Sequence, residues 1–375
     1  MDILALIDIT LRLISAADSG IITAGVVLLM SMQYEVAFPS GKVQYIFGKG
    51  LKSIEPLAPQ PVILTDSHIA SLYPSLTEEY PSIIIPAGES YKTLETLESI
   101  TGQLLQHQAQ RKSILVGVGG GVVTDITGFA AAVYMRGISC GFVPTTLLGM
   151  VDAAIGGKNG IDFGLQKNLV GTIRQPQFIL FDTTFLQTLP EIEWSNGFAE
   201  VIKYACIFDA PLFDELAVNH MAYYQQQQTA LKELIQCCAT WKNQTVQEDE
   251  HENGRRKLLN FGHTVGHAIE TLYQLPHGQA VALGMLVACK VSETVTQLDD
   301  HVYHRLTTVL QQYKLPYSLT LHPERLMDIL VMDKKRNDDK IDFIVLKNIG
   351  HAAIETIGFD VVRKAIDNFS YAGNH

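Results

Sequence analysis

The sequence predicts an α/β domain with a mostly parallel sheet, followed by a second domain built of helices. Three observations predict this. At 375 residues, the chain exceeds most single domains, and about 150 residues per domain gives two. Short apolar runs alternate with helical spacing along the first half, as in parallel-sheet domains. After Pro190 long helical patterns dominate, which places the boundary near Thr188–Pro190.

Composition excludes several classes of protein. Apolar residues make up 47% of the chain and charged residues 18%, so a large core is expected and a disordered chain is excluded. The net charge of −11 argues against nucleic acid and anionic membranes as partners. The chain has five cysteines, an odd number that cannot all pair within it, and no C-x-x-C motif. This favours reduced thiols in a cytoplasmic protein.

Residues 1–31 are expected to form an extension of uncertain status. Asp8, Arg12 and Asp18 interrupt its apolar stretch, so no run reaches the roughly 18 residues that a membrane-spanning helix needs. It also lacks the positive start of a signal peptide. One interpretation is a short helix or loosely attached segment, and the other is that translation starts at Met30 or Met32. An intact mass that includes Met1 would exclude the late start.

Residues 32–188 carry the strand patterns of the first domain. Alternating residues around Pro39-Ser40-Gly41 predict a hairpin, and continuous apolar runs predict buried strands. The expected hairpin strands are Tyr34–Phe38 and Val43–Phe47; the expected buried strands are Pro61–Thr65, Ser82–Ile85, Ser113–Val118, Gly141–Val143 and Phe178–Phe181; the expected helices are Thr93–Gln108 and Val122–Val133.

Residues 189–375 carry mostly helical spacing, with one late strand-like run at Ile341–Leu346. The expected helices are Asn196–Ile207, Met221–Gln247, Leu258–Tyr273, Gly278–Gln297 and His301–Tyr313.

A glycine-rich turn, Gly119-Gly120-Gly121, follows a predicted strand and opens a predicted helix. Glycines let the backbone approach a pyrophosphate, and the helix N-terminus offers free N–H groups. The turn matches neither the G-x-G-x-x-G fingerprint nor a P-loop, and a plain tight turn explains it equally well. Asp66 ends an earlier strand, where it is a candidate to accept a ribose hydroxyl or to cap a helix.

A local excess of positive charge follows the glycine-rich helix. Residues 136–175 hold four cationic side chains against two carboxylates, a reversal of the sign of the whole chain. Lys158, Lys167 and Asn168 lie there among loop glycines, a pattern that suits an anionic small molecule. Solvated lysines on a flexible loop are the alternative.

Three histidines lie within fifteen residues in the second domain. His263 and His267 are four apart on one helical face, and His277 follows at the start of the next helix. Thr264 replaces the glutamate of the H-E-x-x-H motif, so a zinc protease is excluded. With Glu200, two imidazoles and a carboxylate would leave a fourth zinc position open, as catalysis requires. Spacing does not decide which two histidines bind, and polar core residues are the alternative.

Taken together, these segments resemble 3-dehydroquinate synthase, a member of the sugar-phosphate cyclase superfamily. The resemblance runs in order from about Tyr34 to the C-terminus. Its motifs are Gly119–Asp125, Tyr134–Gly137, Pro144–Leu148, Val151-Asp152, Gly156–Lys158, Lys167-Asn168, Glu200–Lys203, Asn260–Glu270, His277-Gly278 and Asp333–Lys335. Thr124 stands where the family usually has glycine, which raises the question whether its side chain crowds the turn.

The resemblance implies a Rossmann-like N-terminal domain and an all-α C-terminal domain. It implies a lyase of the shikimate pathway that converts 3-deoxy-D-arabino-heptulosonate 7-phosphate to 3-dehydroquinate and phosphate. The implied steps are transient oxidation by NAD beside a divalent metal, zinc or cobalt, then phosphate elimination, reduction, ring opening and an aldol closure. The resemblance also implies a homodimer in which Arg136 reaches the neighbouring site.

The resemblance further assigns individual residues to each role. The implied metal ligands are Glu200, His263 and His277. The implied NAD contacts are Asp66, Glu89, Lys92, Gly120, Gly121, Asp125, Thr145, Thr146, Asp152, Lys167 and Thr183. The implied substrate contacts are Asp152, Lys158, Asn168, Lys203, Lys242, Arg256, Asn260, His267 and Lys334.

Three other functions remain open at this point. Another sugar-phosphate cyclase would share the NAD and metal core but lack the carboxylate clamp expected at Lys242 and Arg256. A metal-dependent polyol dehydrogenase would release NADH. A catalytically dead binding protein would lack part of the metal triad or of the basic residues, all of which are present.

Overall fold

The computed structural model describes residues 33–58, 60–164, 166–334 and 340–372, so the predicted extension at residues 1–31 lies outside it. The described residues form two compact units. A sheet unit comprises the described chain up to Pro190 together with Lys232–His251, and a helical unit comprises Glu191–Leu231 and the described chain from Glu252 onward. The predicted domain limits, 32–188 and 189–375, remain a prediction. In the structure, Lys232–His251 groups with the sheet unit.

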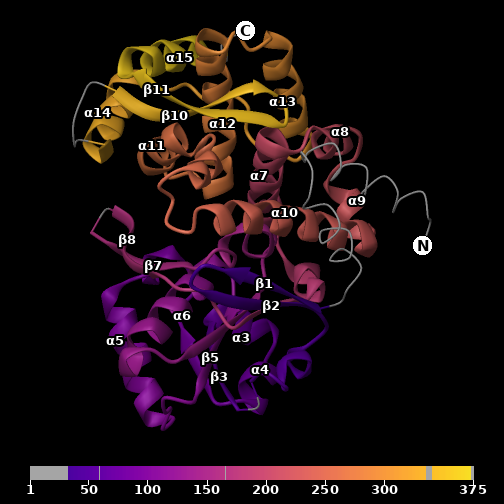
Figure 1. Ribbon diagram of the computed structural model, residues 1–375, viewed down its shortest axis with the longest axis vertical. Coiled ribbons are helices and arrows are strands. Elements are labelled where there is room, and N and C mark those ends of the chain that lie inside the picture. The colour runs from indigo at the N-terminus through magenta and orange to yellow at the C-terminus, as the bar shows by residue number, and fades with distance from the viewer. Residues whose placement is uncertain (1–32, 59, 165, 335–339, 373–375) are drawn as a thin grey trace. The chain divides into compact units, whose positions relative to one another are not determined.

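The sheet unit is built on a seven-stranded sheet with the order β1-β2-β9-β6-β5-β3-β4. Its strands β1, β2, β3 and β5 are labelled in Figure 1. The β1–β2 hairpin is antiparallel and every other pairing is parallel, which confirms the predicted α/β class. Apolar strands suit this sheet because helices cover both faces of a parallel sheet. The strands are β1 (Gln33–Phe38), β2 (Gly41–Phe47), β3 (Pro61–Asp66), β4 (Ser82–Ile85), β5 (Ile114–Gly119), β6 (Ser139–Pro144) and β9 (Phe178–Phe181).

Helices and single helical turns connect these strands. Val116, Val118 and Ile63 of the central strands are almost fully buried and form the middle of the core. The helices are α3 (Ser67–Leu72), α4 (Ser75–Glu79), α5 (Leu94–Gln106) and α6 (Gly121–Val133); the short turns are η1 (Leu51–Ile54), η2 (Glu89–Tyr91), η3 (Tyr134–Arg136), η4 (Gly149–Ala153) and η5 (Thr183–Thr188).

The segment expected to be a flexible loop with lysines is instead an antiparallel hairpin of β7 (Lys158–Phe163) and β8 (Gln166–Ile173). Glycines make this pairing possible, because a Cβ on Gly171 would lie 2.2 Å from the backbone oxygen of Asn159. The loop interpretation was wrong because these glycines allow two backbones to approach closely and pair.

A long helix, α10 (Gln228–Glu248), begins in the helical unit and continues into the sheet unit. Tyr45 donates a hydrogen bond of 2.6 Å to Asn243. The Glu250 carboxylate accepts from the backbone and hydroxyl of Ser40, at 3.0 and 2.6 Å, and from Gln175 at 2.8 Å. These bonds attach the end of α10 to the β1–β2 turn.

The helical unit also contains one small sheet, in which β10 and β11 pair in an antiparallel hairpin. The predicted strand at Ile341–Leu346 is confirmed as part of β10, and its partner was not anticipated. The elements of this unit are α7 (Glu191–Phe208), α8 (Ala210–Val218), α9 (Met221–Gln226), η6 (Arg255–Asn260), α11 (His263–Tyr273), α12 (His277–Val295), α13 (Asp300–Gln312), α14 (Pro323–Lys334), β10 (Lys340–Asn348), β11 (His351–Gly358) and α15 (Phe359–Ala372).

Two predicted helices are broken, and both predictions of continuity were wrong. The expected helix Met221–Gln247 leaves helical geometry at Gln227, where φ is −102° and ψ is 88°. The expected helix Leu258–Tyr273 is a short turn followed by α11, with Gly262 at φ +79° between them. Apolar periodicity continues across both breaks because it reports which face is buried and not the backbone angle at one residue.

In the part of the chain that the structure describes, no helix combines the length and the apolar character needed to cross a membrane.

Candidate active site

Most of the predicted NAD contacts gather at one edge of the sheet. Each follows the carboxyl end of a parallel strand, and these strands are neighbours in the order β9-β6-β5-β3-β4. In open α/β sheets this edge is where ligands bind. The residues are Thr183 after β9, Thr145 and Thr146 after β6, Gly120 and Gly121 after β5, Asp66 at the end of β3, and Glu89 and Lys92 after β4.

The glycine-rich turn lies at the topological switch point between β5 and β3, where the strand order reverses. Side chains have little room here. A Cβ on Gly119 would lie 2.5 Å from Val123, one on Gly120 would lie 3.2 Å from Thr146, and one on Gly121 would lie 3.2 Å from Ala153. No side chain caps the start of α6, so its first N–H groups suit a pyrophosphate.

Thr124 fits the turn without crowding it. Its hydroxyl donates a hydrogen bond of 3.0 Å to the backbone oxygen of Gly121. The buried hydroxyl oxygen of Thr145 has no hydrogen-bond partner among the described residues, as expected for a group that meets a ligand.

Asp66 caps a helix, one of the two roles that the sequence left open. Its Oδ1 accepts from the backbone N–H groups of His68 and Ile69, both at 2.9 Å. These bonds explain why a carboxylate ends a buried strand. A contact between Asp66 and a ribose remains a prediction.

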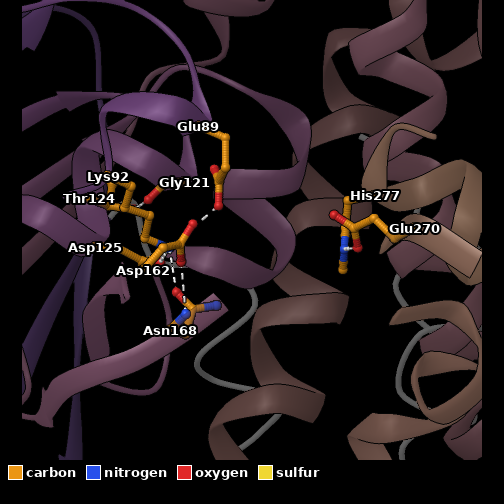
Figure 2. A network of polar contacts seen from close by, with 9 residues as sticks. All are labelled: Glu89, Lys92, Gly121, Thr124, Asp125, Asp162, Asn168, Glu270 and His277. Atoms are coloured by element: carbon orange, nitrogen blue, oxygen red, sulfur yellow. Dashed lines mark hydrogen bonds and ion pairs between the residues drawn. The ribbon is translucent and has the colours of Figure 1, made fainter. Parts of the chain in front are cut away.

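Lys92 links the nucleotide edge to the β7–β8 hairpin. Figure 2 shows its side chain beside those of Asp125 and Asn168. Its Nζ lies 2.6 Å from Asp125 Oδ2, 2.5 Å from Asn168 Oδ1 and 4.0 Å from Glu89 Oε1. Burial lowers the pKa of Lys92, but the carboxylates of Asp125 and Glu89 outweigh burial and hold that pKa above its ordinary value. Lys92 is therefore a charged ammonium group.

The partner residue Asn168 is held in place by two further contacts. It adopts φ +54°, and its backbone N–H donates to Asp162 at 2.8 Å. The N–H of Asp162 in turn donates to the backbone oxygen of Lys92 at 2.8 Å. The structure thus brings together a predicted NAD contact, Lys92, and a predicted substrate contact, Asn168.

Another predicted pair joins the sheet unit to the α10 helix. Lys242 Nζ lies 2.9 Å from Asp152 Oδ1 and 2.7 Å from the Asp152 backbone oxygen. Lys242 therefore belongs with the sheet unit, although its sequence position lies beyond the predicted boundary. Lys158, Lys167 and Arg136 are exposed on the same unit.

Glu200, His263 and His277 form a compact group in the helical unit. Glu200 lies in the middle of α7, and the two histidines are the first residues of α11 and α12. Their ligand atoms lie within 4.8 Å of one another. The Nε2 atoms of His263 and His277 lie 3.4 and 3.5 Å from Glu200 Oε1. This donor set matches a catalytic zinc site with one open position.

The carboxylate of Glu200 is fully buried, and neither oxygen accepts a hydrogen bond from the described residues. Lys203 forms an ion pair with Oε2. Burial raises the pKa of Glu200, but the charges of Lys203 and His263 hold that pKa well below its usual range. Lys203 pairs with Oε2, while Oε1 faces the Nε2 atoms of both histidines, so a divalent cation between them would complete this ionised buried carboxylate.

Close helix packing holds the two histidines at this spacing. A Cβ on Gly284 of α12 would lie 2.0 Å from the backbone oxygen of Gly262, the residue before His263. A Cβ on Gly278, the residue after His277, would lie 2.5 Å from the backbone of Asn196 on α7. Glycines thus let α7, α11 and α12 approach closely enough for their side chains to share one ion.

A second group of potential ligands overlaps the first. His267, Glu270 and His277 also have ligand atoms within 4.8 Å of one another. His267 is exposed, and its ring packs edge-on against that of His263 with centroids 5.4 Å apart. The overlap leaves His277 as the residue common to both groups.

The other predicted substrate residues of the helical unit lie on three elements. Lys203 is buried beside Glu200 on α7, and Arg256 is buried in the η6 turn. Asn260 donates a hydrogen bond of 2.6 Å to Glu252. Lys334 is the last residue of α14, and its side chain lies outside the described part of the structure.

Three polar residues near this group were missed by the sequence reasoning. Asn196 lies one turn before Glu200, and its buried Oδ1 accepts no hydrogen bond from the described residues. Glu252 holds Asn260, and Glu270 lies 3.1 Å from His277. Helical spacing offered a signal for Glu270, because it follows His263 by two turns on the same face.

Comparisons with known proteins agree with this arrangement. The family described as "3-dehydroquinate synthase N-terminal" matches residues 82–196, and "3-dehydroquinate synthase C-terminal" matches residues 197–336. A 3-dehydroquinate synthase from Pyrococcus abyssi is 43% identical over 278 residues, which cover 73% of this chain and 81% of the relative.

Two solved structures share the fold. A 2-deoxy-scyllo-inosose synthase complexed with carbaglucose-6-phosphate, NAD⁺ and Co²⁺ is 26% identical with a TM-score of 0.80, covering 90% of this chain and 99% of its own. A 2-epi-5-epi-valiolone synthase from Streptomyces hygroscopicus with NAD⁺ and Zn²⁺ bound is 27% identical with a TM-score of 0.79, covering 92% and 99%. Together, the two family matches and the identity to a curated relative show that the chain belongs to the 3-dehydroquinate synthase family.

Proposed function

We propose that this chain converts 3-deoxy-D-arabino-heptulosonate 7-phosphate to 3-dehydroquinate and phosphate, with NAD and one divalent metal ion as cofactors. The observation that carries the proposal is the buried group of Glu200, His263 and His277 in a chain of this family. Curated 3-dehydroquinate synthases reach 43% identity to this chain, whereas the 2-deoxy-scyllo-inosose synthase and the 2-epi-5-epi-valiolone synthase are 26% and 27% identical.

The cofactors supply the redox and Lewis-acid chemistry: bound NAD takes up and returns a hydride, and a bound zinc or cobalt ion lowers the pKa of the alcohol that is oxidised. Glu200, His263 and His277 would hold the ion. Gly120 and Gly121 would let the pyrophosphate approach the start of α6, where Thr145 offers a hydroxyl without a partner among the described residues.

Cationic side chains hold the substrate, which carries both a carboxylate and a phosphate. In a chain of net charge −11, this binding needs concentrated positive charge. We assign it to Lys158, Lys203, Lys242, Arg256 and Lys334, with Asn168, Asn260 and His267 as further contacts. Charge-assisted hydrogen bonds fix orientation as well as affinity, and orientation is the main contribution of the protein to a multistep sequence.

The chain itself supplies no base for phosphate elimination in this proposal. Oxidation acidifies the neighbouring C–H, the phosphate group of the substrate takes that proton, and the C–O bond to phosphate breaks. After the hydride is returned, ring opening breaks the C–O bond of the ring and gives a ketone and an enol in one molecule. Aldol closure then forms one carbon–carbon bond between them, and the enol proton ends on the new alcohol oxygen, so no further reactant is required.

We also propose that the enzyme is a homodimer in the cytoplasm, without a nucleic-acid or membrane partner. Three consecutive residues, Met135, Arg136 and Gly137, have positive φ angles of 49°, 66° and 120°, and this turn exposes Arg136. Positive φ is strained for Met135 and Arg136 but not for glycine, and such strain is typical of functional positions. Val133, Met135 and Ile173 are exposed apolar residues of the same unit and support a subunit contact.

One assay tests the activity. The purified chain with NAD and zinc or cobalt is given the heptulosonate phosphate, and released phosphate and NADH are followed together. We expect phosphate release with no net NADH. Accumulation of NADH would indicate a polyol dehydrogenase, and turnover of only neutral sugar phosphates would indicate another cyclase.

A further inference from the structure

Glu270 is a buried carboxylate for which the proposed function has no role. It lies on α11 and is 8% exposed. Its Oε2 lies 3.1 Å from Nδ1 of His277 (Figure 2). Burying a carboxylate costs free energy unless it is paired, and the contact with His277 provides such a pair.

The two ring nitrogens of His277 face two different carboxylates. Nδ1 faces Glu270, and Nε2 lies 3.5 Å from Glu200 Oε1. An ionised carboxylate only accepts hydrogen bonds, so Nδ1 of His277 is the donor to Glu270. An imidazole that carries its proton on Nδ1 has its lone pair on Nε2, on the side of Glu200.

His263 has the same arrangement. Its Nδ1 lies 3.2 Å from the backbone oxygen of Phe261, which also only accepts, and its Nε2 lies 3.4 Å from Glu200 Oε1. Both histidines therefore turn Nε2 toward the same carboxylate oxygen, and each has a separate oxygen acceptor behind it. Histidine ligands of metals commonly donate their other N–H to such an acceptor.

We propose that Glu270 is a positioning residue of the metal site: it accepts the Nδ1 proton of His277 and thereby holds Nε2 toward an ion shared with Glu200 and His263. The proposal rests on the proposed function. In this arrangement Glu270 is a hydrogen-bond acceptor for His277 and not a ligand of a second ion in the group of His267, Glu270 and His277.

The helix geometry suits this role. Glu270 follows His263 by seven residues, two turns along the same face of α11, and so reaches the start of α12 where His277 lies. The close contact between Gly262 and Gly284 keeps the two helices at this spacing. Glu270 thus connects the second histidine to the helix that carries the first.

The test measures metal binding rather than turnover. Metal-free full-length protein is titrated with Co²⁺ against a chelating dye, and the Co²⁺ absorption bands are recorded. Glu270→Ala is expected to weaken Co²⁺ binding by about 10- to 100-fold and to shift the bands. Glu270→Gln is expected to lose less, because the amide oxygen still accepts from Nδ1.

Three further variants make the outcomes distinct. Glu293→Ala is the matched control, since Glu293 lies on α12 and pairs with Lys290 at 2.7 Å. It should bind Co²⁺ as the parent chain does. His267→Ala should also keep the parent affinity, whereas His263→Ala should lose the metal.

Each result points one way. Parent-like affinity and bands in Glu270→Ala, with loss of metal in His263→Ala, would overturn the role of Glu270 and leave the proposed function standing. Equal losses in Glu270→Gln, Glu270→Ala and His267→Ala would make Glu270 a direct ligand and overturn it too. Metal retention in His263→Ala would remove the proposed site itself. If metal-free Glu270→Ala does not fold, Glu270→Gln decides: shifted Co²⁺ bands together with parent-like affinity in His267→Ala support the proposal, and unchanged bands, or equal losses in Glu270→Gln and His267→Ala, oppose it.

Discussion

The side-chain nitrogen of Lys92 lies 2.6 Å from a carboxylate oxygen of Asp125, and this buried ion pair joins the segment after β4 to the first turns of α6. The same nitrogen lies 2.5 Å from Asn168 on β8. One ammonium group therefore connects the predicted nucleotide turn with the hairpin that carries Lys158 and Lys167. A change at Lys92 should affect both.

Lys92→Met should lower both stability and NAD affinity. Removing one partner of a buried ion pair leaves the other charge unpaired, at a cost of about 3–5 kcal/mol in the free energy of unfolding. Denaturant unfolding and NAD titration measure the two effects. Lys112→Met is the control, because Lys112 is exposed on the same unit. Equal stability of the two variants would contradict a structural role for the Lys92 pair.

Glu200→Ala, His263→Ala and His277→Ala should each abolish turnover through loss of the metal. Removing one of three protein ligands leaves too few for a stable site. Metal content per chain and phosphate release are measured on the same samples. Any of the three variants that retained one ion per chain and normal turnover would refute the assignment of that residue.

Gly284→Ala should weaken metal binding without touching a ligand. Its Cβ would lie 2.0 Å from the Gly262 backbone oxygen, so α11 and α12 must separate and His263 moves away from His277. Overpacking of this kind costs about 1–3 kcal/mol or more. Metal titration and thermal unfolding report the two effects.

Gly102→Ala is the control for that change. Gly102 lies in α5, and nothing lies within 4 Å of its Cβ position. The substitution should leave metal binding unchanged and stabilise the chain by up to about 1 kcal/mol. If both glycine variants kept parent-like metal affinity, close packing of α11 and α12 would not be what sets the histidine spacing.

Arg256→Ala should reduce turnover while NAD binding stays unchanged. Arg256 lies in the helical unit, and the predicted NAD contacts lie in the sheet unit. Losing a hydrogen bond to a charged group, about 1.5–3 kcal/mol, corresponds to roughly a ten- to hundredfold loss. Steady-state kinetics and NAD titration separate the two. Because Arg256 is buried, the conservative variant Arg256→Lys is made alongside Arg256→Ala. Equal losses in turnover and NAD affinity would place Arg256 elsewhere.

Mixing two inactive variants tests whether Arg136 reaches a neighbouring subunit. An Arg136→Ala chain keeps its metal ligands, and a His263→Ala chain keeps its Arg136. If Arg136 acts across a dimer, each mixed dimer contains one complete site. Such a dimer should regain up to about half the activity of a parent dimer, which has two sites. Phosphate release is measured after the two chains are refolded together. No recovery, with mixed dimers present, would place Arg136 in its own subunit's site.

Much of the sheet unit could be predicted because its signals are local. Buried parallel strands such as Ile114–Gly119 read as continuous apolar runs, and the turn after them needs glycine at fixed places. The β7–β8 hairpin could not be predicted in this way, because Gly160 and Gly171 have a role only in relation to each other. The break at Gln227 escaped for a similar reason, since nothing in the pattern of apolar residues changes there.

The sequence by itself determined the fold class, the family and the set of residues that carry charge and metal-binding groups, because these depend on residue type, periodicity and spacing. Only the tertiary structure decided that Lys242 belongs with Asp152, that Lys92 faces Asn168, and that Glu270 lies behind His277. These contacts join residues from separate elements, and their distances depend on how helices and strands pack against one another. Periodicity along one element contains no information about the angle and separation of the next.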